Sequence, residues 1–312
     1  MIYLLIILIS FLASLIVIPI LRNFGIKKRL CDEPDGNNLK VHKKPIPYLG
    51  GVGIFLGFIF GLIFARLFHQ VSGLQATGII IGSIVILFLG FWDDLKWKKE
   101  VNPVFKLLCQ FLAGALIVFI LTKIGINFRF SVNPIICAII AGIYIVGAMN
   151  ALNMQDGLDG LAGGITAISL TGFIILSIST SMTFPLILCL ALLGGIAGFL
   201  VYNWNPASIF MGDNGSHLLG FSLAILAIIF SGHPIYNLKQ FIGPVLIMGL
   251  PIIDAIWAII RRISKGQSPM QGDRGHLYDR LRQKGLSTKK TVLICYAVQA
   301  IIVGIGIIIY QT

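Results

Sequence analysis

The stretch PIICAIIAGIYIVGAM NALNMQDGLDGLAGG ITAISLTGFIILSIST, residues 134–180, places one polar segment between two apolar ones. The flanks, 134–149 and 165–180, contain no charged residue. Each flank approaches the length of about 20 residues that crosses a bilayer as a helix. The middle segment, 150–164, contains two aspartates, two asparagines and a cluster of glycines. This pattern predicts two membrane helices joined by a polar turn.

The rest of the chain repeats the apolar pattern. Hydrophobic residues make up 57% of the sequence and charged residues 12%, which excludes an ordinary soluble domain. The first apolar run lacks a basic segment before it, so we expect a retained span rather than a signal peptide. We predict a single membrane domain, 1–312, with an all-α, polytopic helical bundle of about ten transmembrane helices. Their expected ranges are 2–21, 48–68, 75–92, 104–122, 134–149, 161–180, 184–202, 216–230, 241–260 and 291–310.

The basic residues indicate the orientation of the bundle. With ten spans, all but four of the 24 lysines and arginines fall on or beside one side of the membrane. The four exceptions are Arg66, Lys123, Arg129 and Lys239. The positive-inside rule makes the basic side cytoplasmic and puts both termini outside. The net charge of +12 then reflects topology and contact with anionic lipids, and we expect no nucleic-acid partner.

The acidic residues lie on the same side. All twelve fall on the cytoplasmic side or within a span close to it, which the positive-inside rule does not require. A transporter with two gates would place polar groups at mid-membrane and on both faces, usually with an internal repeat. One-sided carboxylates therefore favour chemistry at the cytoplasmic surface.

Four polar clusters form this surface. FWDDLKWKKE (91–100) has adjacent aspartates, Asp93 and Asp94, that suit a divalent cation or a lysine, although a solvated interfacial loop is the alternative. In the opening stretch, polar residues recur every three positions, which gives a stripe beyond what helix caps require. FMGDNGSHLLGF (210–221) places Asp213 before a helix expected to start near Ser216, where amides attract phosphate, or in a plain turn.

The fourth cluster, RRISKGQSPMQGDRGHLYDRLRQKG (261–285), is a basic loop that either binds a polyanion or only sets topology. A further segment, KVHKKPIPYLGGVGIF (40–55), brings lysines to the start of the second span. Asp254 lies inside a span, which makes it a functional candidate or a buried partner of Arg261. Together these clusters predict a site for a magnesium-bridged pyrophosphate at the membrane surface.

Five motifs occur in a known order: FWDDLKWK, NALNMQDGLDGLAGG, FMGDNGSHLLG, PIIDAIWAIIRR and GDRGHLYDRLRQKGLS. From about Lys40 to Ser287 the chain resembles the polyprenyl-phosphate N-acetylhexosamine-1-phosphate transferases of glycosyltransferase family 4. The resemblance implies that undecaprenyl or another polyprenyl phosphate attacks the sugar-linked phosphate of a UDP-N-acetylhexosamine, with UDP-GlcNAc the first choice, and releases UMP. It also implies Mg²⁺ or Mn²⁺ as cofactor, and a homodimer.

The resemblance assigns roles motif by motif. The expected catalytic residues are Asp93, Asp94, Asp156, Asp159 and Lys106. The expected metal ligands are Asp213 and Asp94. The expected substrate-binding residues are Lys44, Asn150, Asn153, Asn203, Phe210, Arg274 and His276. Phe210 matches an aromatic residue that stacks on uracil, and Asp93 matches the residue that deprotonates or orients the lipid phosphate.

One motif departs from the family. The N-acetylglucosamine-using branch has H-x-H-H in its last loop, whereas this chain has His276, Leu277, Tyr278 and Asp279. This leaves the donor open, and the lack of a triple histidine disfavours the muramoyl-pentapeptide branch. A CDP-alcohol phosphotransferase would need D-G-x-x-A-R, and no arginine follows Asp156-Gly157 in that pattern. A transporter or an inactive scaffold is the remaining alternative.

Overall fold

The structure is a computed structural model that describes residues 1–34, 44–97, 103–123, 134–231 and 238–312. Lys40, Lys43 and Lys98, which belong to the predicted polar segments 40–55 and 91–100, lie outside the described residues. The helices are α1 (Ile2–Lys27), α2 (Gly50–Leu67), α3 (Gly73–Trp92), a π-helical turn η1 (Asp93–Trp97), α5 (Pro103–Lys123), α6 (Pro134–Gln155), α7 (Leu161–Ser179), α8 (Thr183–Asn203), α9 (Gly212–Ser231), α10 (Leu238–Ile247), α11 (Gly249–Ser264), α12 (Leu277–Gln283) and α13 (Thr288–Gln311).

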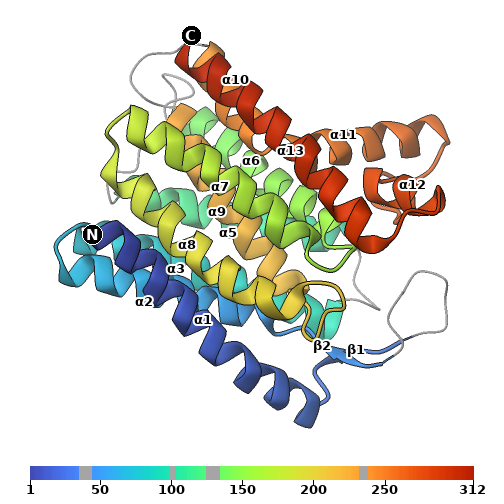
Figure 1. The fold of residues 1–312 in the computed structure, drawn as a ribbon. Helices are drawn as coiled ribbons and strands as arrows, with labels where there is room; N and C mark the ends of the chain where they lie inside the picture. The colour runs from blue at the N-terminus through green and yellow to red at the C-terminus, as the bar shows by residue number, and fades with distance from the viewer. Residues whose placement is uncertain (35–43, 98–102, 124–133, 232–237) are drawn as a thin grey trace.

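The long helices form a bundle, as predicted. Among the described residues, nine helices are long and apolar enough to cross a membrane, and one bent pair would make ten. Both termini lie at one end of the bundle, whereas α12 and the β-strands lie at the other end (Figure 1). Large apolar side chains remain exposed along the outer helices, such as Leu112 on α5 and Ile301 on α13, as expected for surfaces that face lipid. The chain is a multi-pass membrane protein.

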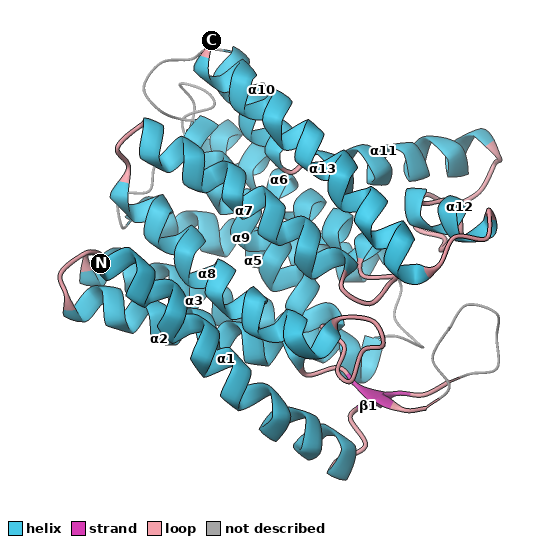
Figure 2. Cartoon of the chain, in the orientation of Figure 1, coloured by secondary structure: helices cyan, strands magenta, loops and turns pink. Residues whose placement is uncertain are grey.

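The only strands in the described residues form a small antiparallel pair. β1 (Cys31–Asp32) pairs with β2 (Ile46–Pro47), with Cys31 opposite Pro47. Figure 2 shows this pair beside the loops at the end of the bundle opposite both termini. The pair connects α1 to α2, and the sequence did not predict it.

The ninth predicted helix, 241–260, is wrong as a single straight element. The structure has two helices there, α10 and α11, bent by 88° at a short break. Pro251 lies in the first turn of α11, where its missing N–H costs no helical hydrogen bond. Gln299 of α13 replaces the bonds lost at the break. Its side chain accepts from the Leu250 amide at 2.9 Å and donates to the Ile247 carbonyl at 2.8 Å.

Helix α9 lies at the centre of the bundle. It packs against α2, α3, α6 and α10, and 83% of its membrane-length window is buried. Its first turn is close to two glycines of neighbouring helices. A Cβ atom on Gly51 would lie 2.3 Å from the Gly215 Cα, and one on Gly90 would lie 2.5 Å from the Asn214 Cα. These glycines let α2 and α3 approach the start of α9, where Asp213 lies.

Candidate active site

Four helices bring charged and amide groups together at the start of α9. Lys106 of α5 forms an ion pair with Asp93, and its Nζ lies 3.8 Å from Oδ2 of Asp213. Asn153, in the last turn of α6, donates to Asp213 Oδ1 at 2.8 Å and to Ser216 Oγ at 2.9 Å. We call Lys106, Asp93, Asp213 and Asn153 the charged node. It joins residues up to 120 positions apart in sequence, as the motif order predicted.

Asp94 has a different environment from its neighbour Asp93. One carboxylate oxygen accepts from the Asp213 amide at 3.1 Å. The other accepts from the Asn214 amide at 3.2 Å and from the Asn214 side chain at 2.8 Å. A carboxylate on the first amides of a helix acts as a cap and interacts favourably with the helix dipole. Asp94 therefore fixes the start of α9, whereas its predicted role as a metal ligand stays a prediction.

The polar turn after α6 is tied to the loop between α8 and α9. Asp159 accepts from the Asn205 side chain at 2.8 Å and from the Ala207 amide at 3.0 Å. Asn203 accepts from the Gly160 amide at 2.9 Å and donates to the Ile209 carbonyl at 2.9 Å. Gly160 has a φ of +79°, a conformation that favours glycine. We call 153–160 the donor turn.

A cavity of about 710 Å³ opens between these segments. Of the predicted site residues, those that line it are Lys44, Asn153, Asp156, Asp159, Asn203, Phe210 and Asp213. Its wall also includes residues that the sequence reasoning missed, notably Asp32, Tyr48 and Thr288. Asp32 lies in β1, Tyr48 directly follows β2, and Thr288 begins α13. Their closeness to the donor turn has no local sequence signal. The volume suits a small-molecule ligand.

The other predicted residues do not line this cavity. Asp93, Asp94 and Lys106 lie directly behind Asp213. Asn150 lies one helical turn deeper and donates to Gln110 at 2.7 Å. Gln110 in turn lies 3.4 Å from the His217 ring, and both are fully buried. Gln110 and His217 each follow a charged-node residue by four positions, which is the signal that could have revealed this second polar layer.

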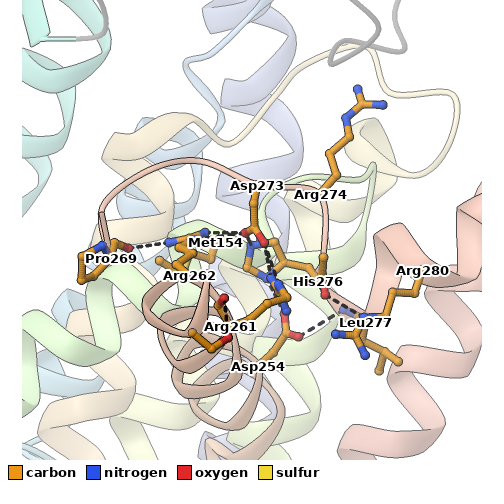
Figure 3. Close-up of polar contacts among 12 residues, drawn as sticks. Met154, Asp254, Arg261, Arg262, Pro269, Asp273, Arg274, His276, Leu277 and Arg280 are labelled. Atoms are coloured by element: carbon orange, nitrogen blue, oxygen red, sulfur yellow. Dashed lines mark hydrogen bonds and ion pairs between the residues drawn. The ribbon is translucent and has the colours of Figure 1, made fainter. Parts of the chain in front are cut away.

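The loop between α11 and α12 and the start of α12 form a separate cluster with α11, shown in Figure 3. Asp254 of α11 accepts from Gln155 at 2.7 Å, lies 2.7 Å from Nδ1 of His276, and accepts from the Leu277 amide at 3.1 Å. The expected alternative partner, Arg261, pairs instead with Asp273. Sequence proximity suggested the arginine, but the loop folds back over α11 and brings the histidine to Asp254. Asp254 therefore has partners in two different segments.

Asp273, in this loop, is the second aspartate of the cluster, and arginines contact it. Arg262 donates to Asp273 at 2.7 Å and to the Pro269 carbonyl at 2.7 Å. Burial alone would raise the pKa of Asp273, but hydrogen bonds and charges from Arg262 and Arg261 outweigh it and lower that pKa. Arg274, a predicted donor-binding residue, is exposed and points away from the cluster in Figure 3.

A divalent cation fits the charged node. The described residues contain no group of three or more His, Cys, Asp or Glu side chains arranged for a metal ion. Yet Asp93 and Asp213 both approach the ammonium group of Lys106, so two carboxylates already share one cation. Mg²⁺ bound with phosphates needs only one or two carboxylates, because phosphate oxygens and water complete its octahedral shell. The oxygen ligands present match that requirement.

The fold and site define a polytopic helical membrane protein with a polar, charged site at one end of its bundle. The sequence profile described as "Glycosyl transferase family 4" matches residues 76–231. The chain belongs to glycosyl transferase family 4.

Three relatives illustrate the family. A Bacillus subtilis protein named "Probable undecaprenyl-phosphate N-acetylglucosaminyl 1-phosphate transferase" is 35% identical over 298 residues, which cover 93% of this chain and 80% of the relative. A Mycobacterium tuberculosis "Decaprenyl-phosphate N-acetylglucosaminephosphotransferase" is 29% identical, covering 82% of this chain and 70% of that protein. A Streptococcus uberis "Phospho-N-acetylmuramoyl-pentapeptide-transferase" is 33% identical, covering 71% of each.

Proposed function

We propose that this protein transfers N-acetylglucosamine 1-phosphate from UDP-GlcNAc to undecaprenyl phosphate or another polyprenyl phosphate, and releases UMP. The product would be the first lipid-linked intermediate of a cell-surface glycan. The observation that supports this most strongly is the cavity between the donor turn and Asp213, beside a lysine shared by two carboxylates. The names of the similar proteins support the same class of reaction.

The proposed reaction exchanges one phosphoanhydride bond for another. An oxygen of the lipid phosphate attacks the phosphorus linked to the sugar, and the bond from that phosphorus to the oxygen of UMP breaks. A fully ionised lipid phosphate loses no proton in this exchange. Enzymes catalyse such phosphoryl transfers mostly by positioning the groups and neutralising their charge. Asp93 then has no need to remove a proton and would act by orienting Lys106.

The charged node supplies groups for that task. Lys106 provides the ammonium group that would contact a phosphate oxygen, and Asp93 holds it in place from the buried side. Asp213 and Asp93 would hold the Mg²⁺ ion, for which Mn²⁺ is a substitute. A bound magnesium ion would neutralise the negative charge on the diphosphate. Asp94 would act through the α9 amides that it caps.

The cavity wall supplies groups for the donor. Phe210 presents an aromatic face that would stack on the uracil ring. Asp156 and Asn153 offer hydrogen-bonding groups from the donor turn, and Lys44 offers a positive charge at the opposite wall. Asp159 and Asn203 have most of their bonding capacity directed to the loop before α9, so they would shape the wall.

We place the site on the cytoplasmic face of the cell membrane, with both termini outside. The basic residues that predict this orientation are concentrated in the loops at the α12 end of the bundle, opposite both termini (Figure 1). UDP-sugars are made in the cytoplasm, so this orientation gives the donor access to the cavity. A homodimer is part of the proposal because of the family resemblance.

The test is UMP release by the purified protein in detergent or nanodiscs. Undecaprenyl phosphate, Mg²⁺ and one of three donors would be supplied: UDP-GlcNAc, UDP-GalNAc or UDP-MurNAc-pentapeptide. We expect release with UDP-GlcNAc that requires both lipid and metal. Release with UDP-MurNAc-pentapeptide alone would instead support the activity named for the Streptococcus uberis relative. No release with any donor from folded protein would contradict the proposal.

A further inference from the structure

The donor turn is contacted from behind by the last cytoplasmic loop. The side chain of Gln155 donates to Asp254 at 2.7 Å, and the carbonyl of Met154 accepts from the Tyr278 hydroxyl at 3.2 Å. A Cβ atom on Gly157 would lie 2.3 Å from that hydroxyl. Three of four successive positions, 154, 155 and 157, therefore touch Asp254 or Tyr278, which together with His276 we call the rear cluster. Asp156, between them, lines the cavity.

Asp254 connects the donor turn to the last loop. Its Oδ2 atom contacts both Gln155 of α6 and His276 of the last loop, and its Oδ1 atom accepts from the Leu277 amide at the start of α12. All of its partners approach from elements other than α11. Gln155, Asp254 and His276 are each more than nine-tenths buried. Buried hydrogen bonds to a charged group are strong and costly to lose.

Tyr278 provides a second, independent contact between the last loop and the donor turn. Its ring stacks on that of His276, with centroids 5.6 Å apart and an angle of 5° between the planes. Its hydroxyl reaches past the missing side chain of Gly157 to the Met154 carbonyl. Tyr278 is one of the two positions, with Asp279, at which the chain departs from the H-x-H-H pattern. A tyrosine spans the distance to the donor turn and bonds its backbone.

His276 is held away from the cavity by the same cluster. It is 4% exposed and does not line the cavity wall. Figure 3 shows its ring between Asp254 and Asp273. Its ring nitrogens lie 2.7 Å and 3.9 Å from those two carboxylates. A ring directed at protein carboxylates in this way supports the loop and does not contact the donor.

We propose that Asp254, with His276 and Tyr278, is a positioning cluster that sets the donor turn from behind and so determines affinity for the nucleotide sugar. This inference rests on the proposed function for the identity of the ligand. Its residues act through Gln155 and Met154, which place Asp156 and Asn153 on the cavity wall. Lys106, which would contact the lipid phosphate, lies on the Asp213 side of the turn, where Asn153 donates to Asp213. Loss of the cluster therefore weakens donor binding and leaves acceptor binding unchanged.

The first test is a kinetic comparison of single and double variants. Asp254→Asn and Gln155→Leu should each raise the KM for UDP-GlcNAc about tenfold, because each disrupts the hydrogen bond between Gln155 and the buried Asp254 carboxylate. The KM for undecaprenyl phosphate should change less than about twofold in both, since distant sites couple weakly. The double variant should resemble the single ones, because both changes break the same link. Equal losses for donor and acceptor, or fully additive losses, would overturn the inference.

A matched control is available in the same loop. Asp279→Asn makes the same chemical change three residues after His276. Asp279 accepts a backbone hydrogen bond from His276, and none of the interactions described for it reaches the donor turn. We expect its donor KM to stay within about twofold of the original, as for a substitution outside the link. A tenfold rise in this control would show that the net charge of the loop governs donor affinity, and the positioning role would be refuted.

Hydrogen exchange tests the link without any activity. In Asp254→Asn the amides of 156–160 and of Leu277 should both exchange faster, because both segments lose the same partner. In Gln155→Leu only the donor turn should exchange faster, because the Leu277 amide keeps Asp254. Unchanged exchange in the donor turn of both variants would overturn the inference. If exchange responds as expected but the original protein releases no UMP, the proposed function fails and the link stands.

Discussion

The charged node and the rear cluster each contain a buried aspartate, Asp93 and Asp254, but these carboxylates differ in their surroundings. In the node, Lys106 is shared by Asp93 and Asp213, and Asp213 faces the cavity. In the rear cluster, Asp254 bonds protein groups on both oxygens, and neither it nor His276 lines the cavity. Charges directed into a cavity are available for a ligand, whereas charges bonded to each other fix the chain. The charged node therefore holds groups available for chemistry, whereas the rear cluster holds groups that position the chain.

The largest expected effect comes from Asp213→Asn. Of the three charged side chains of the node, Asp213 is the one that lines the cavity, so the substitution should lower the rate of UMP release at least about a thousandfold. Thermal unfolding should stay close to that of the original protein, because asparagine preserves the shape. A rate within about tenfold of the original, with folding intact, would remove Asp213 from the chemical role.

Lys106 should give the next largest effect. Lys106→Met leaves two carboxylates without their shared cation, and we expect kcat to fall about a hundredfold. Lys106→Arg keeps the charge in a different shape and should lose about tenfold. Lys265→Met, at an exposed residue after α11, is the control for loss of a positive charge. Equal rates for the methionine and arginine variants would show that the charge itself is not used.

Asp94 lies beside the charged node but resembles Asp254, because both of its carboxylate oxygens accept hydrogen bonds from protein groups. Asp94→Asn should destabilise the protein by about 1–2 kcal/mol, the usual cost of a weakened helix cap. Asp93→Asn should reduce turnover severely with a smaller effect on stability. Thermal unfolding and UMP release measured on both variants check this. A stable but inactive Asp94→Asn protein would instead support a direct metal-binding role for Asp94.

The smallest effect is expected at Asp279, and it depends on pH. Burial raises the pKa of Asp279 above its ordinary value, although the neighbouring His276 opposes the shift. Its charged form is therefore disfavoured in the folded protein. The stability this group contributes is fully present below the unfolded pKa of about 4 and is lost as pH rises through the folded value. Asp279→Asn should thus raise the unfolding temperature slightly at pH 7, and the gain should vanish as pH falls towards 4.

Local patterns were enough to predict much of this structure. Apolar runs marked the membrane helices, and the three-residue spacing from Asn150 to Asp159 marked a polar stripe that the structure divides between the end of α6 and the donor turn. The structure brings Asp93, Lys106 and Asp213 together, whereas their catalytic and metal-binding roles stay predictions. Each of these features could be predicted from residues close together in the sequence or from a recognised motif.

The features that were missed depend on distant partners. The break between α10 and α11 is satisfied by Gln299, and the partner of Asp254 is a histidine 22 positions away rather than the nearer Arg261. Two glycines of the 150–164 segment, Gly157 and Gly164, lie against the tyrosines at 278 and 296. Such contacts form only when the bundle assembles, so no window of sequence contains them.

The central claim is that the protein transfers a phosphosugar and not a sugar alone. The most direct measurement supplies UDP-GlcNAc labelled with ³²P on the sugar-linked phosphate, together with polyprenyl phosphate and Mg²⁺. The account predicts that the label enters the organic-solvent-extractable lipid and that the released UMP is unlabelled. Label recovered in water-soluble UDP, with unlabelled sugar on the lipid, would show that the bond between sugar and phosphate was cleaved, and would contradict it.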